Sequence, residues 1–166
     1  MIHTIISPEE AGDITAEVRK TTQFSIGYMW VGEKQAFAFN LPIKMNRESY
    51  EIIGGLDEKI QKALDVAPEN MTPGRFNVYT GGSYYKTHVD APVIQGICTD
   101  KAFTLFLSDP SSYDGGELLI HRKAGSCAYK LAAGQAIVYP CRWPHEVTTV
   151  TRGFRLAMIG WFQNPL

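Results

Sequence analysis

The second half of the chain consists of short apolar segments separated by turn residues, and this pattern limits the fold more than any other feature. From Arg75 onwards, stretches rich in aromatic and β-branched residues end at clusters such as Gly81-Gly82 and Asp109-Pro110. Such alternation is typical of successive β-strands. The predicted strands cover residues 76–79, 103–107, 117–121, 128–131, 135–139, 145–151 and 154–162. Many short strands at this spacing predict a mainly β domain built as a sandwich or barrel.

The first part of the chain predicts helices and strands that support this β region. Residues 7–10, Ser-Pro-Glu-Glu, combine a hydroxyl cap with a proline at the first helical position, so a helix is predicted from here to about Lys20. The other predicted elements are a strand over 2–6, strands over 24–40 with a turn near 32–33, and a second helix over 47–66. A chain of 166 residues fits one domain. We expect a single domain over residues 1–166, in which residues 1–74 support a core of residues 75–166 that carries the functional site.

Composition excludes several classes of protein. Apolar residues make up 45% of the chain, charged residues 20%, and the formal net charge is −1, which gives no general reason to bind nucleic acid or an anionic membrane. No stretch approaches the ~18 apolar residues of a membrane span, and the N-terminus lacks the pattern of a signal peptide. The three cysteines, Cys98, Cys127 and Cys141, are widely spaced, so a disulfide framework or zinc site is not expected. Reduced thiols in a cytoplasmic protein are the simplest interpretation.

One of the four histidines, His88, lies close in sequence to a second potential metal ligand, Asp90. His88 and Asp90 are separated by one residue, and on a strand both would point to the same face. His145, at the start of a later predicted strand, is the best candidate for a third ligand. Two histidines and one carboxylate leave coordination positions open, as Fe(II) oxygen chemistry requires. A zinc hydrolase with a similar triad is the alternative, although it would also need a general base. We expect His3 and His121 to be surface or structural residues.

An arginine ten residues after His145 suggests a second binding group. Arg155 lies between apolar residues just after Gly153, which allows a tight turn, so we expect its charge to face inward from a strand. A buried guanidinium needs an anionic partner, and its planar fork suits a carboxylate. Arg152, before the turn, is the weaker candidate. Tyr79 is a second candidate for contact with a bound carboxylate, and an aromatic core position is the alternative for it.

Four passages of this sequence, taken in order, resemble the Fe(II)/2-oxoglutarate oxygenases of the prolyl 4-hydroxylase type, most of all the bacterial PKHD-type hydroxylases. They are Tyr79-x-x-Gly82-x-x-Tyr85-x-x-His88-x-Asp90; the run 104–110 followed by Tyr113-Asp114-Gly115-Gly116-Glu117-Leu118; residues 134–140; and His145-x-Val147-x-x-Val150-Thr151-x-Gly153-x-Arg155. Together they lie within residues 75–162. The chain departs from the family's pattern at Cys98, near a usual arginine, and at Lys101-Ala102. Family members also usually continue beyond the last strand with a helical tail, whereas this sequence ends at Leu166.

The resemblance implies a double-stranded β-helix, or jelly roll, with N-terminal helices. It implies Fe(II) bound by His88, Asp90 and His145, and 2-oxoglutarate anchored by Arg155. The implied reaction uses O2 and couples decarboxylation of 2-oxoglutarate to hydroxylation of a substrate C–H bond, with ascorbate as a possible reductant. Succinate and CO2 are the co-products.

The identity of the substrate remains open at this point. By resemblance it is a prolyl residue in a protein or peptide, and the alternative is a free amino acid or another small metabolite. A non-catalytic, cupin-like metal-binding or sensing domain belongs to another class, and Arg155 argues against it. A nucleic-acid demethylase on the same fold is less compatible with the charge. For the substrate we name Tyr85, Arg142 and Trp143 as candidate contacts.

Overall fold

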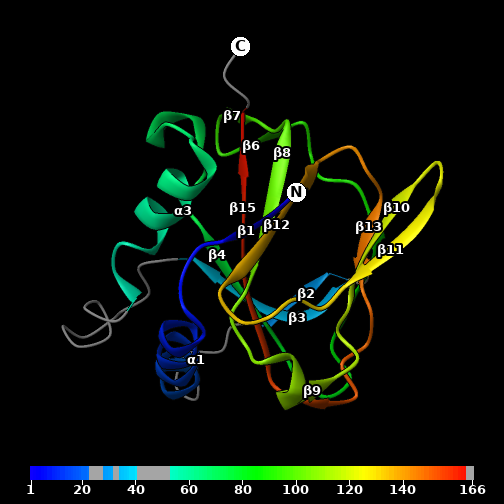
Figure 1. The fold of residues 1–166 in the computed structure, drawn as a ribbon. Coiled ribbons are helices and arrows are strands. Elements are labelled where there is room, and N and C mark those ends of the chain that lie inside the picture. The colour runs from blue at the N-terminus through cyan, green and yellow to red at the C-terminus, as the bar shows by residue number, and fades with distance from the viewer. Residues whose placement is uncertain (23–27, 32–33, 41–52, 164–166) are drawn as a thin grey trace.

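The computed structural model describes residues 1–22, 28–31, 34–40 and 53–163, and it shows a β-rich molecule with helices on one side (Figure 1). The elements of the first part are β1 (Ile2–Thr4), α1 (Pro8–Thr22), β2 (Tyr28–Val31), β3 (Lys34–Asn40) and α3 (Leu56–Leu64). The later strands are β4 (Arg75–Tyr79), β5 (Tyr84–His88), β6 (Val93–Ile94), β7 (Ile97–Cys98), β8 (Lys101–Phe106), β9 (Tyr113–Asp114), β10 (Leu118–Arg122), β11 (Gly125–Tyr129), β12 (Gln135–Pro140), β13 (His145–Val147), β14 (Arg152–Gly153) and β15 (Arg155–Phe162).

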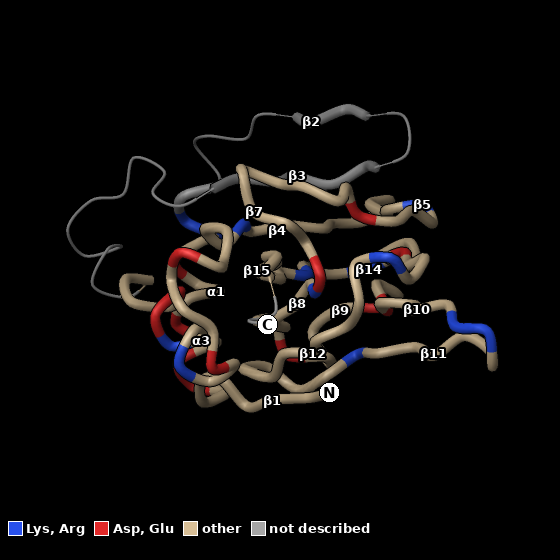
Figure 2. The backbone as a smooth tube through the Cα atoms, turned by 90° about the horizontal axis from the view of Figure 1, so that it is seen from above, with Lys and Arg blue, Asp and Glu red and all other residues tan. Residues whose placement is uncertain are grey.

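The long sheet determines where the functional residues lie. Its strand order is β1-β12-β8-β15-β4-β3-β5-β13-β10-β11, with β2 paired to β3, and the pairs are antiparallel. Strand β3 pairs with both β4 and β5, so it links the strands from β1 to β4 with the strands from β5 to β11. These two groups face each other as layers (Figures 1 and 2). This is the mainly β jelly roll that the sequence predicts.

Side chains alternate along the central strands between two apolar cores. Phe76 and Val78 of β4 belong to the core that also contains buried residues of α1 and α3, whereas Tyr79 belongs to the core between the two layers. On β15 the same alternation sends Leu156 to the helical core and Trp161 to the inner one. The helices therefore cover one face of the central strands, which leaves the other face to line an interior site (Figure 2).

The predicted elements are mostly confirmed, with corrections at their ends. Helix α1 begins at Pro8, and the hydroxyl oxygen of Ser7 accepts a hydrogen bond from the backbone N–H of Glu10 at 3.1 Å, as the predicted cap requires. Of the second helix, expected over 47–66, the structure describes α3 over Leu56–Leu64, which follows Gly55 in a left-handed conformation with φ of 77°. Residues 41–52 and the predicted turn at 32–33 lie outside the described residues. The strand predicted over 145–151 is divided, since β13 ends at Val147 and β14 begins later.

Two expectations from composition can be compared with the structure. Cys98, Cys127 and Cys141 are all free thiols, as expected, while a cytoplasmic location stays a prediction. No helix in the described ranges combines the length and apolar character needed to cross a membrane. Lys and Arg are mixed with Asp and Glu over the helices and strands that Figure 2 colours.

Candidate metal centre

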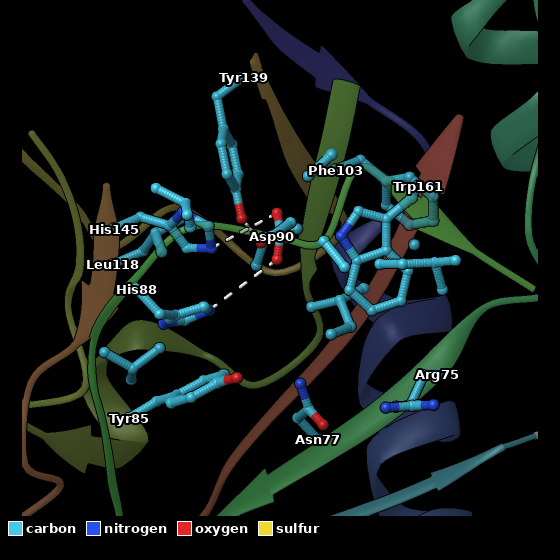
Figure 3. A pocket seen from close by; sticks show the side chains of 18 of the residues that line it. Arg75, Asn77, Tyr85, His88, Asp90, Phe103, Leu118, Tyr139, His145 and Trp161 are labelled. Carbon is cyan, nitrogen blue, oxygen red and sulfur yellow. Dashed lines mark hydrogen bonds and ion pairs between the residues drawn. The ribbon is translucent and has the colours of Figure 1, made fainter. Parts of the chain in front are cut away.

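Three side chains from two neighbouring segments converge where β5 meets β13. His88 ends β5 and His145 begins β13, and the two are direct partners in the antiparallel register. The Nε2 atom of His88 lies 3.9 Å from one carboxylate oxygen of Asp90, and Nε2 of His145 lies 3.7 Å from the other. One ligand atom from each residue falls within 4.8 Å of the others (Figure 3). The predicted triad is therefore brought together.

Backbone carbonyls orient both imidazoles. The Nδ1 atoms of His88 and His145 each lie 2.8 Å from a carbonyl oxygen, that of Lys86 and that of Trp143 respectively. Since a carbonyl only accepts hydrogen bonds, Nδ1 must carry the proton, which leaves the lone pair on Nε2 for a metal. Burial lowers the pKa of His145 below its ordinary value, which favours the neutral ring that ligation needs.

Asp90 joins the site for a different reason from the predicted one. Strand β5 ends at His88, so the two residues do not share a strand face. Instead, the backbone N–H of Asp90 donates to the carbonyl oxygen of Cys141 at 3.2 Å, and this contact fixes the turn. The indole N–H of Trp161 donates to the Asp90 carboxylate. Burial raises the pKa of Asp90, and the hydrogen bond from Trp161 and the neighbouring His88 partly oppose this rise.

The donor set fits a divalent transition-metal ion. Ligand atoms at ~2 Å from one metal ion lie roughly 3 to 4 Å apart, close to the distances between Asp90 and the two imidazoles. The Oδ2 atom of Asp90 is buried and has no hydrogen-bond partner among the described residues. A buried carboxylate oxygen without a partner is costly, and a metal ion would satisfy it. Two imidazoles and one carboxylate match the arrangement that leaves positions open for other ligands.

The triad lies in a cavity of about 320 Å³ between the two layers of strands. Tyr85, a candidate substrate contact, stacks on the ring of His88, with ring centroids 3.7 Å apart, and it lines the cavity. Tyr139 packs edge-on against His145 at 5.0 Å. The further lining residues include Thr104, Leu118, Arg75, Asn77, Val89, Ile94, Ile159 and Trp161.

Arg155 forms the buried inner end of this cavity. The residue is 1% exposed, and its guanidinium lies 4.8 Å from the ring centroid of Tyr79 and 5.4 Å from that of Phe106. Its Nε and Nη2 atoms have no hydrogen-bond partner among the described residues. Gly116 makes room for it, because a Cβ atom there would lie 2.8 Å from Cδ of Arg155. A buried cation with free donors beside a metal site fits an anionic ligand.

Two tyrosines accompany this arginine. Tyr79 is its register partner on β4, and burial raises the pKa of Tyr79 to about 12, so the phenol stays protonated at neutral pH. Tyr113, which had no predicted role, is 1% exposed, and its hydroxyl also lacks a hydrogen-bond partner within the described chain. Burial raises the pKa of Tyr113, and the adjacent Arg155 guanidinium opposes the rise. Two polar groups with spare hydrogen-bonding capacity, the Arg155 guanidinium and the Tyr113 hydroxyl, thus lie beside Tyr79 at the inner end.

Other predicted residues lie away from the cavity. Arg142 is exposed, and Trp143 packs with the guanidinium of Arg122 at 5.9 Å from its ring centroid; neither lines the cavity. The structure therefore lends no support to a substrate role for these two residues. His121 contacts Ser126 and Glu146, in line with the structural role expected for it.

Several cavity residues were missed although a signal for them existed. On β15, Ile159 and Trp161 lie four and six residues after Arg155, so period-two alternation puts all three on one face. On β4 the same rule relates Arg75 and Asn77 to Tyr79, and all of these residues line the cavity. Tyr113, which adjoins Arg155 and is not one of the residues that line the cavity, had no such signal, because its place depends on the pairing of β9 with β14.

Comparisons with known proteins agree with this geometry. A family model described as the 2OG-Fe(II) oxygenase superfamily matches residues 74–163. A PKHD-type hydroxylase of Paraburkholderia phymatum is 34% identical over 180 residues, covering 98% of this chain and 77% of that protein. A PKHD-type hydroxylase of Teredinibacter turnerae is 48% identical over 102 residues, covering 58% of this chain and 45% of that protein. The chain spans about half the length of relatives such as the latter.

A solved structure shows the same fold at low sequence identity. It is a prolyl hydroxylase in complex with a hypoxia inducible factor oxygen degradation domain peptide fragment from Trichoplax adhaerens. It superimposes with a TM-score of 0.76 at 17% identity, covering 98% of this chain and 82% of that chain.

Proposed function

Because the chain belongs to the 2OG-Fe(II) oxygenase superfamily and, within it, to the PKHD-type hydroxylases, we propose that it is a dioxygenase that hydroxylates a C–H bond of its substrate. The cofactors are those of the family, Fe(II) and 2-oxoglutarate, with O2 as the oxidant. One observation carries the proposal: two imidazole nitrogens and a buried carboxylate lie within 4.8 Å of one another in a cavity that ends at a buried arginine.

In this proposal each side chain of the triad has a defined task. Nε2 of His88, Nε2 of His145 and the carboxylate of Asp90 hold Fe(II). When bound, Fe(II) supplies the activation of O2 that couples decarboxylation of 2-oxoglutarate to insertion of one oxygen atom into the substrate C–H bond; the other oxygen atom enters succinate, and CO2 is released. Trp161 positions the carboxylate through its indole N–H. Tyr85 keeps the ring of His88 in place by stacking on it.

The inner end of the cavity would bind the carboxylate of 2-oxoglutarate that lies farther from the metal. Arg155 supplies a charge and two unused donor atoms, Nε and Nη2, and Tyr113 supplies a hydroxyl. The rings of Tyr79 and Phe106 enclose the guanidinium and exclude water from it, which strengthens the ion pair. The binding energy at this end orients the keto-acid group towards the triad.

Tyr113→Phe tests the inner end of the cavity. Losing one hydrogen bond to a charged group costs about 1.5–3 kcal/mol, so the KM for 2-oxoglutarate should rise roughly 10- to 100-fold. The kcat at saturating 2-oxoglutarate should change little. Tyr129→Phe, on the β10–β11 hairpin and away from the cavity lining, is the matched control and should leave both constants unchanged. An unaltered KM in Tyr113→Phe would show that this hydroxyl does not contact the co-substrate.

We propose a prolyl residue of a protein or peptide as the substrate, supported by the names of the PKHD-type relatives and of the peptide-bound structural neighbour. A second candidate is a free amino acid or small metabolite. The size of the cavity favours it, because about 320 Å³ is at the lower end of ligand pockets and must also hold 2-oxoglutarate. Both candidates require the same site and the same cofactors.

The function is tested by following 2-oxoglutarate. Purified protein with Fe(II), O2 and ascorbate, added to keep the iron reduced, is expected to form succinate slowly without substrate and faster with it. Proline-containing peptides and free amino acids, added separately, then distinguish the two substrate classes. The matched control is the same protein with a chelator, which should form none. Absence of both succinate formation and 2-oxoglutarate binding would favour a non-catalytic metal-binding domain.

A further inference from the structure

A pair of buried hydroxyl groups lies in the wall of the cavity, apart from Arg155 and Tyr113. Tyr139 of β12 and Thr104 of β8 are diagonal neighbours, because Thr104 pairs with Ile137, two residues before Tyr139. Their hydroxyl oxygens are 3.4 Å apart. Tyr139 is 5% exposed and Thr104 is 3% exposed, yet both line the cavity. This Tyr139–Thr104 hydroxyl pair is therefore shielded from bulk water and faces the space that a ligand would occupy.

The hydroxyl pair has one donor more than it uses. Each hydroxyl carries one hydrogen and two lone pairs, and only one hydrogen can lie between the two oxygens. Among the described residues neither hydroxyl forms another hydrogen bond. Burial and the nearby charge of Asp90 raise the pKa of Tyr139, so the phenol keeps its proton at neutral pH. A buried donor without a partner is costly, and a polar ligand in the cavity would satisfy it.

The hydroxyl pair lies at the metal end of the cavity. The ring of Tyr139 packs edge-on against His145, with ring centroids 5.0 Å apart, and its hydroxyl points towards the carboxylate of the triad (Figure 3). Thr104 is the register partner of Ile159, which lies four residues along β15 from Arg155. The cavity therefore has hydrogen-bonding groups at both ends, the guanidinium at the inner end and the hydroxyl pair beside the triad.

2-Oxoglutarate carries a carboxylate at each end, and these two sets of groups match them. The inner end binds the carboxylate that lies farther from the metal, as proposed above. The other carboxylate, next to the keto group, then lies beside the triad. A carboxylate has two oxygens and about four acceptor sites, so one that binds a metal ion can still accept a hydrogen bond. Because Fe(II) supplies the positive charge at this end, a neutral hydroxyl is a sufficient partner.

We propose that the Tyr139–Thr104 hydroxyl pair binds the keto-acid end of the co-substrate, with Tyr139 donating a hydrogen bond to the carboxylate next to the keto group. A phenol is the more acidic of the two hydroxyls, so it is the better donor to an anion. Thr104 donates to the phenol oxygen and thereby fixes the orientation of the phenol. This inference rests on the proposed dioxygenase function and assigns two further residues to its co-substrate site.

Tyr139→Phe removes the donor and keeps the aromatic ring. Fe(II) chelated by a keto acid absorbs visible light, so anaerobic titration of the Fe(II)-loaded protein with 2-oxoglutarate gives the Kd without turnover. Calorimetry of the Zn(II)-loaded protein with N-oxalylglycine, an inert analogue of 2-oxoglutarate, gives a second Kd. Both Kd values should rise roughly 10- to 100-fold, the effect of losing a hydrogen bond to a charged group. Thr104→Val loses only a hydrogen bond between neutral groups and should raise them roughly 2- to 10-fold.

The position of the visible absorption band identifies which end of the co-substrate is affected. At saturating 2-oxoglutarate the band should shift in Tyr139→Phe, whose missing hydroxyl bonds to the chelating carboxylate. It should stay unchanged in Tyr113→Phe, which acts at the inner end. Tyr129→Phe, away from the cavity lining, should keep the wild-type Kd values and band. Unchanged Kd values in Tyr139→Phe, or raised values with an unshifted band, would overturn the proposal.

Metal binding distinguishes this result from a change in the triad. Fe(II) should raise the Tm of Tyr139→Phe as much as that of wild type, since the three ligands are intact. A smaller rise would make the Tyr139 hydroxyl a support for the metal ligands and would also overturn the proposal. If wild type gives no visible band with 2-oxoglutarate and does not bind N-oxalylglycine, the dioxygenase function itself fails, and this inference fails with it.

Discussion

Asp90→Ala is expected to abolish Fe(II) binding and turnover while leaving the metal-free protein folded. Removing a group that merely orients a metal ligand typically weakens metal binding 10- to 100-fold, so losing a ligand should cost more than about a hundredfold. In the metal-free protein the substitution acts on the free energy of unfolding through two opposing effects. The Asp90 carboxylate is buried with one oxygen unpartnered, so its removal relieves a desolvation cost of about 1–3 kcal/mol and loses the hydrogen bond from Trp161.

Thermal unfolding with and without Fe(II) under anaerobic conditions measures both effects. A ligand at about 100 times its Kd stabilises by ~2.7 kcal/mol, which for a chain of this size raises Tm by roughly 5–10 °C. Wild type should show this rise, and Asp90→Ala and His88→Ala should not. Asp13→Ala, an exposed carboxylate on α1, and His3→Ala are the controls and should keep both the rise and the activity. An Asp90→Ala protein that still binds Fe(II) and forms succinate would refute the ligand assignment.

The metal ligands were predictable because strong chemical constraints act on few candidates. With four histidines in the chain, a His-x-Asp pair and two later histidines, His121 and His145, leave little choice. The geometric reason was nevertheless wrong for Asp90, whose place depends on a backbone hydrogen bond to Cys141, far away in sequence. The period-two alternation of side chains predicts which residues of one strand share a face. It carries no information on a contact that forms only when two distant segments meet.

The predicted substrate contacts show the same limit of sequence-based reasoning more strongly. Trp143, two residues before His145 in sequence, was named as a candidate substrate contact, yet Trp161 is the tryptophan that lines the cavity. Period-two alternation from Arg155 leads to Trp161, provided that the strand is known to stay regular over its whole length. The role of Tyr113 could not be predicted in this way, because β9 has only two residues and the position of Tyr113 depends on the pairing of β9 with β14. Residues on long strands were thus accessible to sequence reasoning, and those fixed by short loop pairings were not.

Arg155→Leu should raise the KM for 2-oxoglutarate by roughly 30-fold to several thousandfold. Truncating one partner of a buried, hydrogen-bonded charge pair costs about 2–5 kcal/mol, and 1.4 kcal/mol corresponds to a factor of ten. Arg155→Lys keeps the charge but loses the planar fork, so its KM should fall between those of wild type and Arg155→Leu. Steady-state succinate formation at varied 2-oxoglutarate concentration gives these values, and calorimetry with N-oxalylglycine gives the matching change in Kd.

Arg152→Ala is the matched control, because the two arginines are three residues apart and differ in environment. Arg152 is exposed and forms a bidentate pair with Asp114, at 2.6 and 3.1 Å, whereas Arg155 is buried with Nε and Nη2 unpartnered. The control should leave the KM unchanged. Fe(II) should raise the Tm of Arg155→Leu as much as that of wild type, since the triad is intact. If Arg155→Leu instead lost metal binding, or kept the wild-type KM, the guanidinium would be a structural group and the co-substrate carboxylate would have to lie elsewhere.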